Sequence, residues 1–176
     1  MNQEENTVRR HNLNWPLWTG RQGEDVAVLL SGGVDSSVAM RLILEQGKIP
    51  HPYYLKIWLE DELAHLGQCP WKEDLEYANA VCEQVGVNLE PVSLQKDYWD
   101  RVVTYTLSEA RAERTPNPDV MCNSRVKFGA FFDRFGRQFE HVVTGHYART
   151  AINEHTGLTE LRLSADSHKD QTYFLA

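Results

Sequence analysis

VAVLLSGGVDSSVAM, residues 26–40, is the stretch of sequence that decides the fold. Its first five residues are all apolar, as expected for a strand that is buried on both faces. Two glycines and several hydroxyl-bearing or acidic residues follow. The segment 38–46 is then apolar on most sides, and Gly47 is a typical helix-ending residue. The stretch therefore predicts a strand, a glycine turn and a helix.

The turn SGGVDSS (residues 31–37) has the composition of an anion-binding site. Gly32 and Gly33 allow a close approach of the backbone, and the following helix offers unpaired N–H groups and the positive end of its dipole. Asp35 is expected either to cap the helix or to orient a metal ion beside phosphates. Hydroxyl donors are expected from Ser31, Ser36 and Ser37. The Walker A and GxGxxG patterns are absent, and the alternative is a glycine turn that merely starts a helix.

The rest of the chain alternates between strand-like and helix-like segments. We expect further strands at 53–58, 87–94 and 141–144, helices at 73–85, 98–112 and 123–135, and a hairpin formed by 147–152 and 158–163. This alternation predicts an α/β fold with a doubly wound, mainly parallel, Rossmann-like sheet. Ligands of such sheets bind at the carboxyl ends of the strands, where the glycine turn lies. Residues 1–24 are expected to form an irregular leader before one domain at 25–176.

Composition sets only broad limits. The chain has 176 residues, of which 41% are hydrophobic and 24% charged, as in an ordinary globular protein. It has neither an apolar run of membrane-spanning length nor the apolar core of a signal peptide. We therefore expect no membrane partner and a cytoplasmic location, with a plastid or mitochondrion as the alternative. The net charge of −7 argues weakly against nucleic acid. Six basic residues nevertheless gather in 111–137, forming either a local patch or a solvated helix face: Arg111, Arg114, Arg125, Lys127, Arg134 and Arg137.

The three cysteines do not form a disulfide scaffold or a zinc ribbon, because their number is odd and no CxxC occurs. Cys82 lies on the apolar face of the predicted helix 73–85 and is expected in the core. Cys69 stays undecided, and its spacing from Cys122 gives little support for an iron–sulfur cluster. Cys122 follows a proline-bounded turn and is expected to open a helix, where the helix dipole, Arg125 and Lys127 would lower its thiol pKa. The alternative for Cys122 is a buried structural cysteine.

The turn SGGVDSS resembles the PP-loop of ATP pyrophosphatases, which cleave ATP between the α and β phosphates. Four further segments resemble the MnmA-type tRNA-specific 2-thiouridylases, in that family's order. They are CPWKEDLEYANAVC (69–82), TPNPDVMCNSRVKFGAF (115–131), TGHYAR (144–149) and DSHKDQTYFL (166–175). The strings TPNPDxxCN and KDQTYFL are together highly specific to that family. The resemblance covers nearly the whole chain after residue 25.

The resemblance implies an enzyme that uses ATP with Mg²⁺ to adenylate the wobble uridine of a tRNA before sulfur from a persulfide donor protein replaces the oxygen. It implies that Cys122 is the nucleophile of sulfur transfer, and it implies no metal site built by the protein. The implied ATP-binding residues are Leu29, Leu30, Ser31, Gly32, Gly33, Val34, Asp35, Ser36, Ser37, Leu55 and Gly145. At Gly145 the missing side chain would let adenine or ribose come close. The implied tRNA-binding residues are Asn117, Pro118, Asp119, Lys169, Asp170 and Gln171.

The sequence also departs from the family's pattern. Members of the family continue with a second active cysteine, a central domain and a β-barrel. We therefore expect this polypeptide to bind ATP without completing thiolation alone, with a separate chain as one source of the remaining part. Glu113 stands where the family often has glycine, and Leu30 where it often has methionine. Two alternatives stay open: another PP-loop ligase that adenylates a small molecule, and a non-catalytic ATP-binding remnant or partner.

Overall fold

The computed structural model describes residues 24–57, 70–166 and 168–175. The predicted leader, apart from Glu24, and Cys69 lie outside the described residues. Four parallel strands form one sheet in the order β3-β2-β1-β4: β1 (Asp25–Leu29), β2 (Ile49–Lys56), β3 (Glu90–Ser93) and β4 (His141–Val143). The strand order reverses at β1, next to β4. The predicted α/β fold with a mainly parallel sheet is confirmed, and the point of reversal is where such sheets bind ligands.

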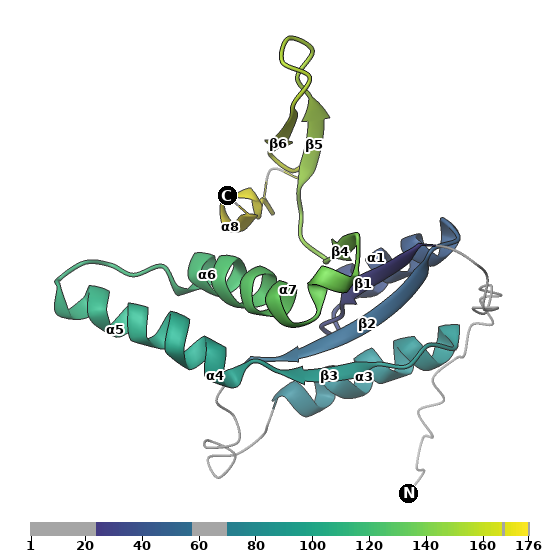
Figure 1. The fold of residues 1–176 in the computed structure, drawn as a ribbon, viewed down its shortest axis with the longest axis horizontal. Coiled ribbons are helices and arrows are strands. Elements are labelled where there is room, and N and C mark those ends of the chain that lie inside the picture. The colour runs from purple at the N-terminus through teal and green to yellow at the C-terminus, as the bar shows by residue number, and fades with distance from the viewer. Residues whose placement is uncertain (1–23, 58–69, 167, 176) are drawn as a thin grey trace, which may run out of the picture.

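Helices cover both faces of this sheet. The first face carries α1 (Val34–Glu45) and α3 (Pro70–Val85). The second carries two long helical segments. One consists of α4 (Gln95–Tyr98), η2 (Trp99–Val103) and α5 (Thr104–Arg111). The other consists of α6 (Pro118–Met121), η3 (Cys122–Ala130) and α7 (Phe131–Arg134). Figure 1 shows α3 lying along β3 and the segment from α6 to α7 lying beside the segment from α4 to α5.

Alternate residues of β1 point into two separate cores, as the two-residue period of a strand requires. Ala27 and Leu29 pack with Tyr53, Val92 and the helices of the second face, where Phe131 is the largest fully buried side chain. Val28 and Leu30 pack on the first face with Tyr54 and with residues of α1 and α3: Met40, Ala78, Cys82 and Val85. Residues 26–30 are therefore buried on both faces, as predicted, and they hold the turn that follows at the edge of the sheet.

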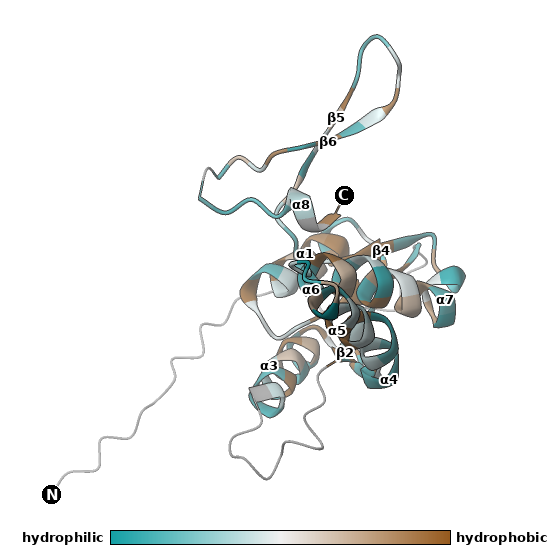
Figure 2. Ribbon diagram, turned by 90° about the vertical axis from the view of Figure 1, so that its left-hand side faces the viewer, coloured by the Kyte–Doolittle hydropathy of each residue, from teal (hydrophilic) through white to brown (hydrophobic). Residues whose placement is uncertain are grey.

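The remaining elements extend from this body. η4 (Gly136–Gln138) precedes β4, and β5 (Arg149–Ile152) pairs antiparallel with β6 (Thr159–Arg162), which confirms the predicted hairpin. The hairpin projects away from the sheet, and the short helix α8 (Thr172–Leu175) follows it (Figures 1 and 2). The Tyr173 side chain on α8 is 54% exposed. Within the described residues, no helix is long and apolar enough to cross a membrane.

Candidate functional site

The glycine turn lies at the carboxyl end of β1 and leads directly into α1. Gly33 is the N-cap of α1 and has an extended backbone (φ −74°, ψ 158°), and no side-chain hydrogen bond caps the helix. The first N–H groups of a helix have no partner within the helix. The amino end of α1 therefore offers free amide donors and the positive end of its dipole, which together suit an anion.

The serine hydroxyls of the turn are used differently from the prediction. Ser36 is buried, and its Oγ donates to the Gly33 carbonyl at 3.0 Å while accepting from the Ser31 amide at 3.2 Å. Ser37 Oγ also donates to the Gly33 carbonyl, at 2.9 Å. In this structure these hydroxyls shape the turn, so its main free donors are the backbone amides.

Two glycines at this site make room for protein backbone. Gly32 has φ +80°, and a Cβ there would lie 2.3 Å from the Asp74 carbonyl oxygen at the start of α3. A Cβ at Gly145 would lie 2.5 Å from the Ser36 amide nitrogen. The missing side chain of Gly145 therefore makes room for the first turn of α1, while its place beside adenine or ribose stays a prediction. Gly33 is different, because a Cβ there would meet only Ser31 Oγ, at 3.5 Å.

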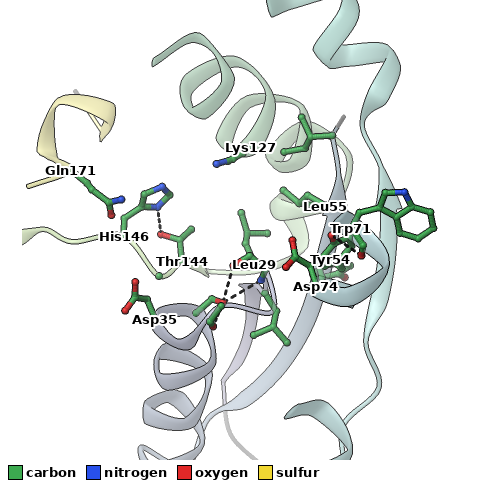
Figure 3. A pocket seen from close by; sticks show the side chains of 17 residues that line it. Leu29, Asp35, Tyr54, Leu55, Trp71, Asp74, Lys127, Thr144, His146 and Gln171 are labelled. Atoms are coloured by element: carbon green, nitrogen blue, oxygen red, sulfur yellow. Dashed lines mark hydrogen bonds between the residues drawn. The ribbon is translucent and has the colours of Figure 1, made fainter. Parts of the chain in front are cut away.

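A pocket of about 380 Å³ opens above the turn (Figure 3). Its size is in the range of small-ligand sites. Eight of the residues expected at ATP line it: Leu29, Leu30, Ser31, Gly33, Asp35, Ser36, Leu55 and Gly145. Gly32, Val34 and Ser37 belong to the same turn but do not line the pocket, and Val34 is 73% exposed.

Other lining residues were missed by reasoning from the sequence. Apolar and aromatic walls come from Tyr53, Tyr54, Ile57 and Trp71, and polar groups come from Asp74, Lys127, Thr144 and His146. Trp71, Asp74, Thr144 and His146 lie within segments that resemble the family, which was the only signal for them. His146 Nδ1 lies 2.8 Å from the Thr144 hydroxyl (Figure 3). Burial and then the charge of Lys127 lower the pKa of His146, which favours the neutral imidazole.

The segment KDQ reaches the turn from the far end of the chain. Lys169 Nζ lies 3.1 Å from Asp35 Oδ2 and 4.1 Å from the centre of the Tyr147 ring. The Tyr147 hydroxyl donates to Asp35 Oδ1 at 3.2 Å, and the Tyr147 amide donates to Gln171 Oε1 at 2.9 Å. Asp35 is thus engaged by two side chains. Gln171 lines the pocket, whereas Asp170 accepts from the Ser164 amide and the Thr172 hydroxyl.

The segment NPD starts a helix and does not line the pocket. Asn117 is the N-cap of α6, where its Oδ1 accepts from the Val120 amide at 3.2 Å, and Pro118 is the first helical residue. Asn117 and Asp119 are exposed. Helix α6 packs against α8, so the two segments expected at tRNA, NPD and KDQ, belong to neighbouring parts of the surface.

Cys122 does not open its helix. The helix begins at Pro118, so Cys122 lies one turn inside it, half-buried against the core on the second face of the sheet. Burial raises the pKa of Cys122 and Asp119 raises it further, whereas Lys127 lowers it. The expected depression of this pKa is therefore wrong, because desolvation outweighs the nearby cation. Cys122 does not line the pocket.

Cys82 and, apart from Lys127, the basic residues of 111–137 do not line the pocket. Cys82 is 2% exposed in the core, as expected, and burial raises its thiol pKa to about 11. Three of the six basic residues in 111–137 are ion-paired: Arg114 with Glu109, Arg134 with Asp97, and Arg137 with Asp133. Those three belong to compensated helix faces. Among the described residues, no group of three or more His, Cys, Asp or Glu side chains is arranged to hold a metal ion.

Comparison with known proteins places this chain in a family. The tRNA methyl transferase HUP domain matches residues 24–176. A tRNA-specific 2-thiouridylase MnmA of Porphyromonas gingivalis is 47% identical over 152 residues, which are 86% of this chain and 41% of that protein. The MnmA of Parabacteroides distasonis is 44% identical over 151 residues, again 86% and 41%. MnmA 2 of Bacteroides fragilis is 45% identical over 152 residues, or 86% and 42%. The chain spans about two fifths of the length of these curated relatives, and it belongs to the family of the tRNA methyl transferase HUP domain.

Proposed function

We propose that residues 25–176 form the ATP-binding and adenylating domain of an ATP-dependent tRNA 2-thiouridylase. The observation that carries this proposal is the uncapped amino end of α1 at the floor of a 380 Å³ pocket, at the point where the strand order of a parallel sheet reverses. The names of the relatives supply the substrate class, a tRNA uridine.

In this proposal the nucleotide phosphates bind the free amides of the turn, and adenine lies against Leu55 and the aromatic wall that contains Tyr54 and Trp71. Asp35 and Asp74 are the carboxylates among the described lining residues. Oxygen ligands of this kind suit Mg²⁺, which usually binds through one or two carboxylates together with phosphates. When bound, the ion would neutralise phosphate charge. Part of the contact between Asp35 and Lys169 would then be replaced by a contact between Asp35 and the bound nucleotide.

The first chemical step is adenylation of a flipped uridine. Its O2 attacks the α phosphorus, the bond from that phosphorus to the bridging oxygen breaks, pyrophosphate leaves with the electron pair, and the N3 proton passes to solvent. Catalysis of such a step consists mainly of positioning and charge stabilisation. The lowered pKa of His146 fits a neutral hydrogen-bonding group at the pocket wall.

The second step transfers sulfur. The terminal sulfur of a donor persulfide attacks C2, and AMP leaves with its oxygen. The Cys122 thiolate then attacks the donor-side sulfur of the C2–S–S link, forms a disulfide with the donor and releases 2-thiouridine. A thiol reductant restores Cys122. The exposed Asn117 and Asp119, next to α8, would contact the tRNA whose uridine enters the pocket.

Release of pyrophosphate from Mg·ATP in the presence of unmodified tRNA tests this function. Ser36→Ala removes the hydroxyl that ties Ser31 to Gly33, and Asp35→Asn removes the charge beside Lys169. We expect each variant to release pyrophosphate at least about tenfold more slowly, because Ser36→Ala loosens the turn whose amides would hold the phosphates and Asp35→Asn removes a charge beside them. Asp133→Asn, at an exposed pair with Arg137 on α7, is the control and should keep the wild-type rate. Equal rates for Ser36→Ala and the wild type would sink the assignment of the turn.

A further inference from the structure

Lys127 has a position that the steps above do not use. It lies on η3 and is the one lysine or arginine among the described residues that line the pocket. Figure 3 shows its side chain across the pocket from Asp35, reaching toward the side that carries His146. No ion pair joins Lys127 to another described residue, whereas Lys169 is neutralised by Asp35. Lys127 thus brings an unneutralised positive charge to the cavity that would receive the phosphates.

The π-helical geometry of η3 puts Lys127 and Cys122 on the same side of that helix. In an α-helix, with about 3.6 residues a turn, residues i and i+5 are separated by roughly 140° around the axis. In a π-helix the hydrogen bonds run between residues five apart, so i and i+5 lie on the same side of the helix. Cys122 and Lys127 are five residues apart in η3. Their electrostatic coupling agrees with this arrangement, because Lys127 is the group that lowers the pKa of Cys122.

We propose that Lys127 is a cation that serves two groups in turn. It binds the α phosphate when a nucleotide occupies the pocket, and it stabilises the thiolate of Cys122 when the pocket holds no nucleotide. The inference rests on the proposed function and adds an order of events to it. While ATP or AMP is bound, the phosphate competes for the ammonium group and the Cys122 thiolate is less stable. Once AMP has left, the ammonium group offsets part of the desolvation of Cys122 and makes its thiolate more accessible, and the thiolate is the form that the last step of sulfur transfer requires.

Three variants of the 176-residue chain test this role. Lys127→Met removes the charge and keeps most of the side-chain volume, whereas Lys127→Arg keeps a charge at the same place. Arg125→Met is the matched control, because Arg125 lies in the same helical segment but is exposed and does not line the pocket. Binding of Mg·ATP is measured by calorimetry. Alkylation of Cys122 by iodoacetamide is followed from pH 6 to pH 11, with and without AMP, and assigned to Cys122 by peptide mapping.

For Lys127→Met we expect about tenfold weaker ATP binding and a higher pH midpoint of Cys122 alkylation, since a nearby cation favours the charged form of the thiol. AMP should raise this midpoint in the wild type and much less in Lys127→Met. Lys127→Arg should keep ATP binding within a few-fold, and Arg125→Met should match the wild type in both measurements. If the wild type binds ATP and Lys127→Met changes neither quantity, or only one, the shared role is wrong and the proposed function stands. If the wild type binds no ATP, both fail.

Discussion

Gly33 and Gly145 border the same pocket, but their missing side chains serve different purposes. Gly145 lets the segment after β4 rest on the first turn of α1, with the virtual Cβ 2.5 Å from the Ser36 amide. Gly33 has an ordinary φ, and a side chain there would meet little protein. At the residue scale, therefore, packing requires glycine at position 145, and we expect access to the turn to require it at position 33.

Alanine substitutions separate these two roles. Gly145→Ala should lower the free energy of unfolding by about 1–3 kcal/mol, the usual cost of overpacking, and should weaken ATP binding because α1 is displaced. Gly33→Ala should change stability by less than about 1 kcal/mol, because alanine fits its backbone, yet weaken ATP binding about tenfold. Urea unfolding and calorimetry on the same samples measure both effects. A Gly145→Ala protein as stable as the wild type would refute the packing argument.

The helix α5 ends in a backbone motif that favours glycine. The Arg114 amide donates to the Glu109 carbonyl at 2.9 Å and the Glu113 amide donates to the Ala110 carbonyl at 3.1 Å, which is the Schellman pattern. Glu113 has φ +57° and is the one non-glycine residue with positive φ in the described part of the chain. The sequence departs from the family's pattern at this same position, because the family that it resembles often has glycine where this chain has Glu113.

Replacing Glu113 by glycine should relieve this strain. The left-handed conformation costs a non-glycine residue roughly 1–2 kcal/mol, and the extra flexibility of glycine in the unfolded chain offsets part of the gain. We expect Glu113→Gly to raise the free energy of unfolding by about 0.5–1 kcal/mol in urea titrations. Glu113→Ala keeps the Cβ and should bring no such gain, so equal stabilisation by both variants would show that the backbone conformation is not the cause.

Element boundaries show where local sequence patterns were too weak. β2 begins at Ile49, four residues before the predicted start, although Pro50 and Pro52 lie in it. β3 pairs only with residues from Tyr53 onward, so the two prolines lie where β2 has a neighbour on one side only and a missing N–H is tolerated. The start of α6 had a usable signal, because Asn before Pro is a typical N-cap and first-turn pair. Using that signal would have placed Cys122 inside the helix.

At the scale of the whole molecule, the features that could be predicted from the sequence are those that local patterns determine. The alternation of strands and helices gave the parallel sheet, and the motif at residues 31–37 gave the place of the pocket. The pocket itself joins residues from Leu29 to Gln171. The roles of Lys127 and Lys169 depend on how distant helices and loops pack, and the lysine–aspartate contact spans the chain from Asp35 to Lys169. No local periodicity encodes such contacts, so only the folded chain brings them together.

The central claim is that the turn between β1 and α1 holds the phosphates of a nucleotide. Calorimetric titration of the 176-residue chain with Mg·ATP and, separately, with adenosine tests it most directly. The account predicts saturable binding of Mg·ATP with one site per chain and an affinity for adenosine weaker by about two orders of magnitude, because a neutral nucleoside cannot use the free amides of α1. Absence of saturable Mg·ATP binding, or equal affinities for the two ligands, would contradict it.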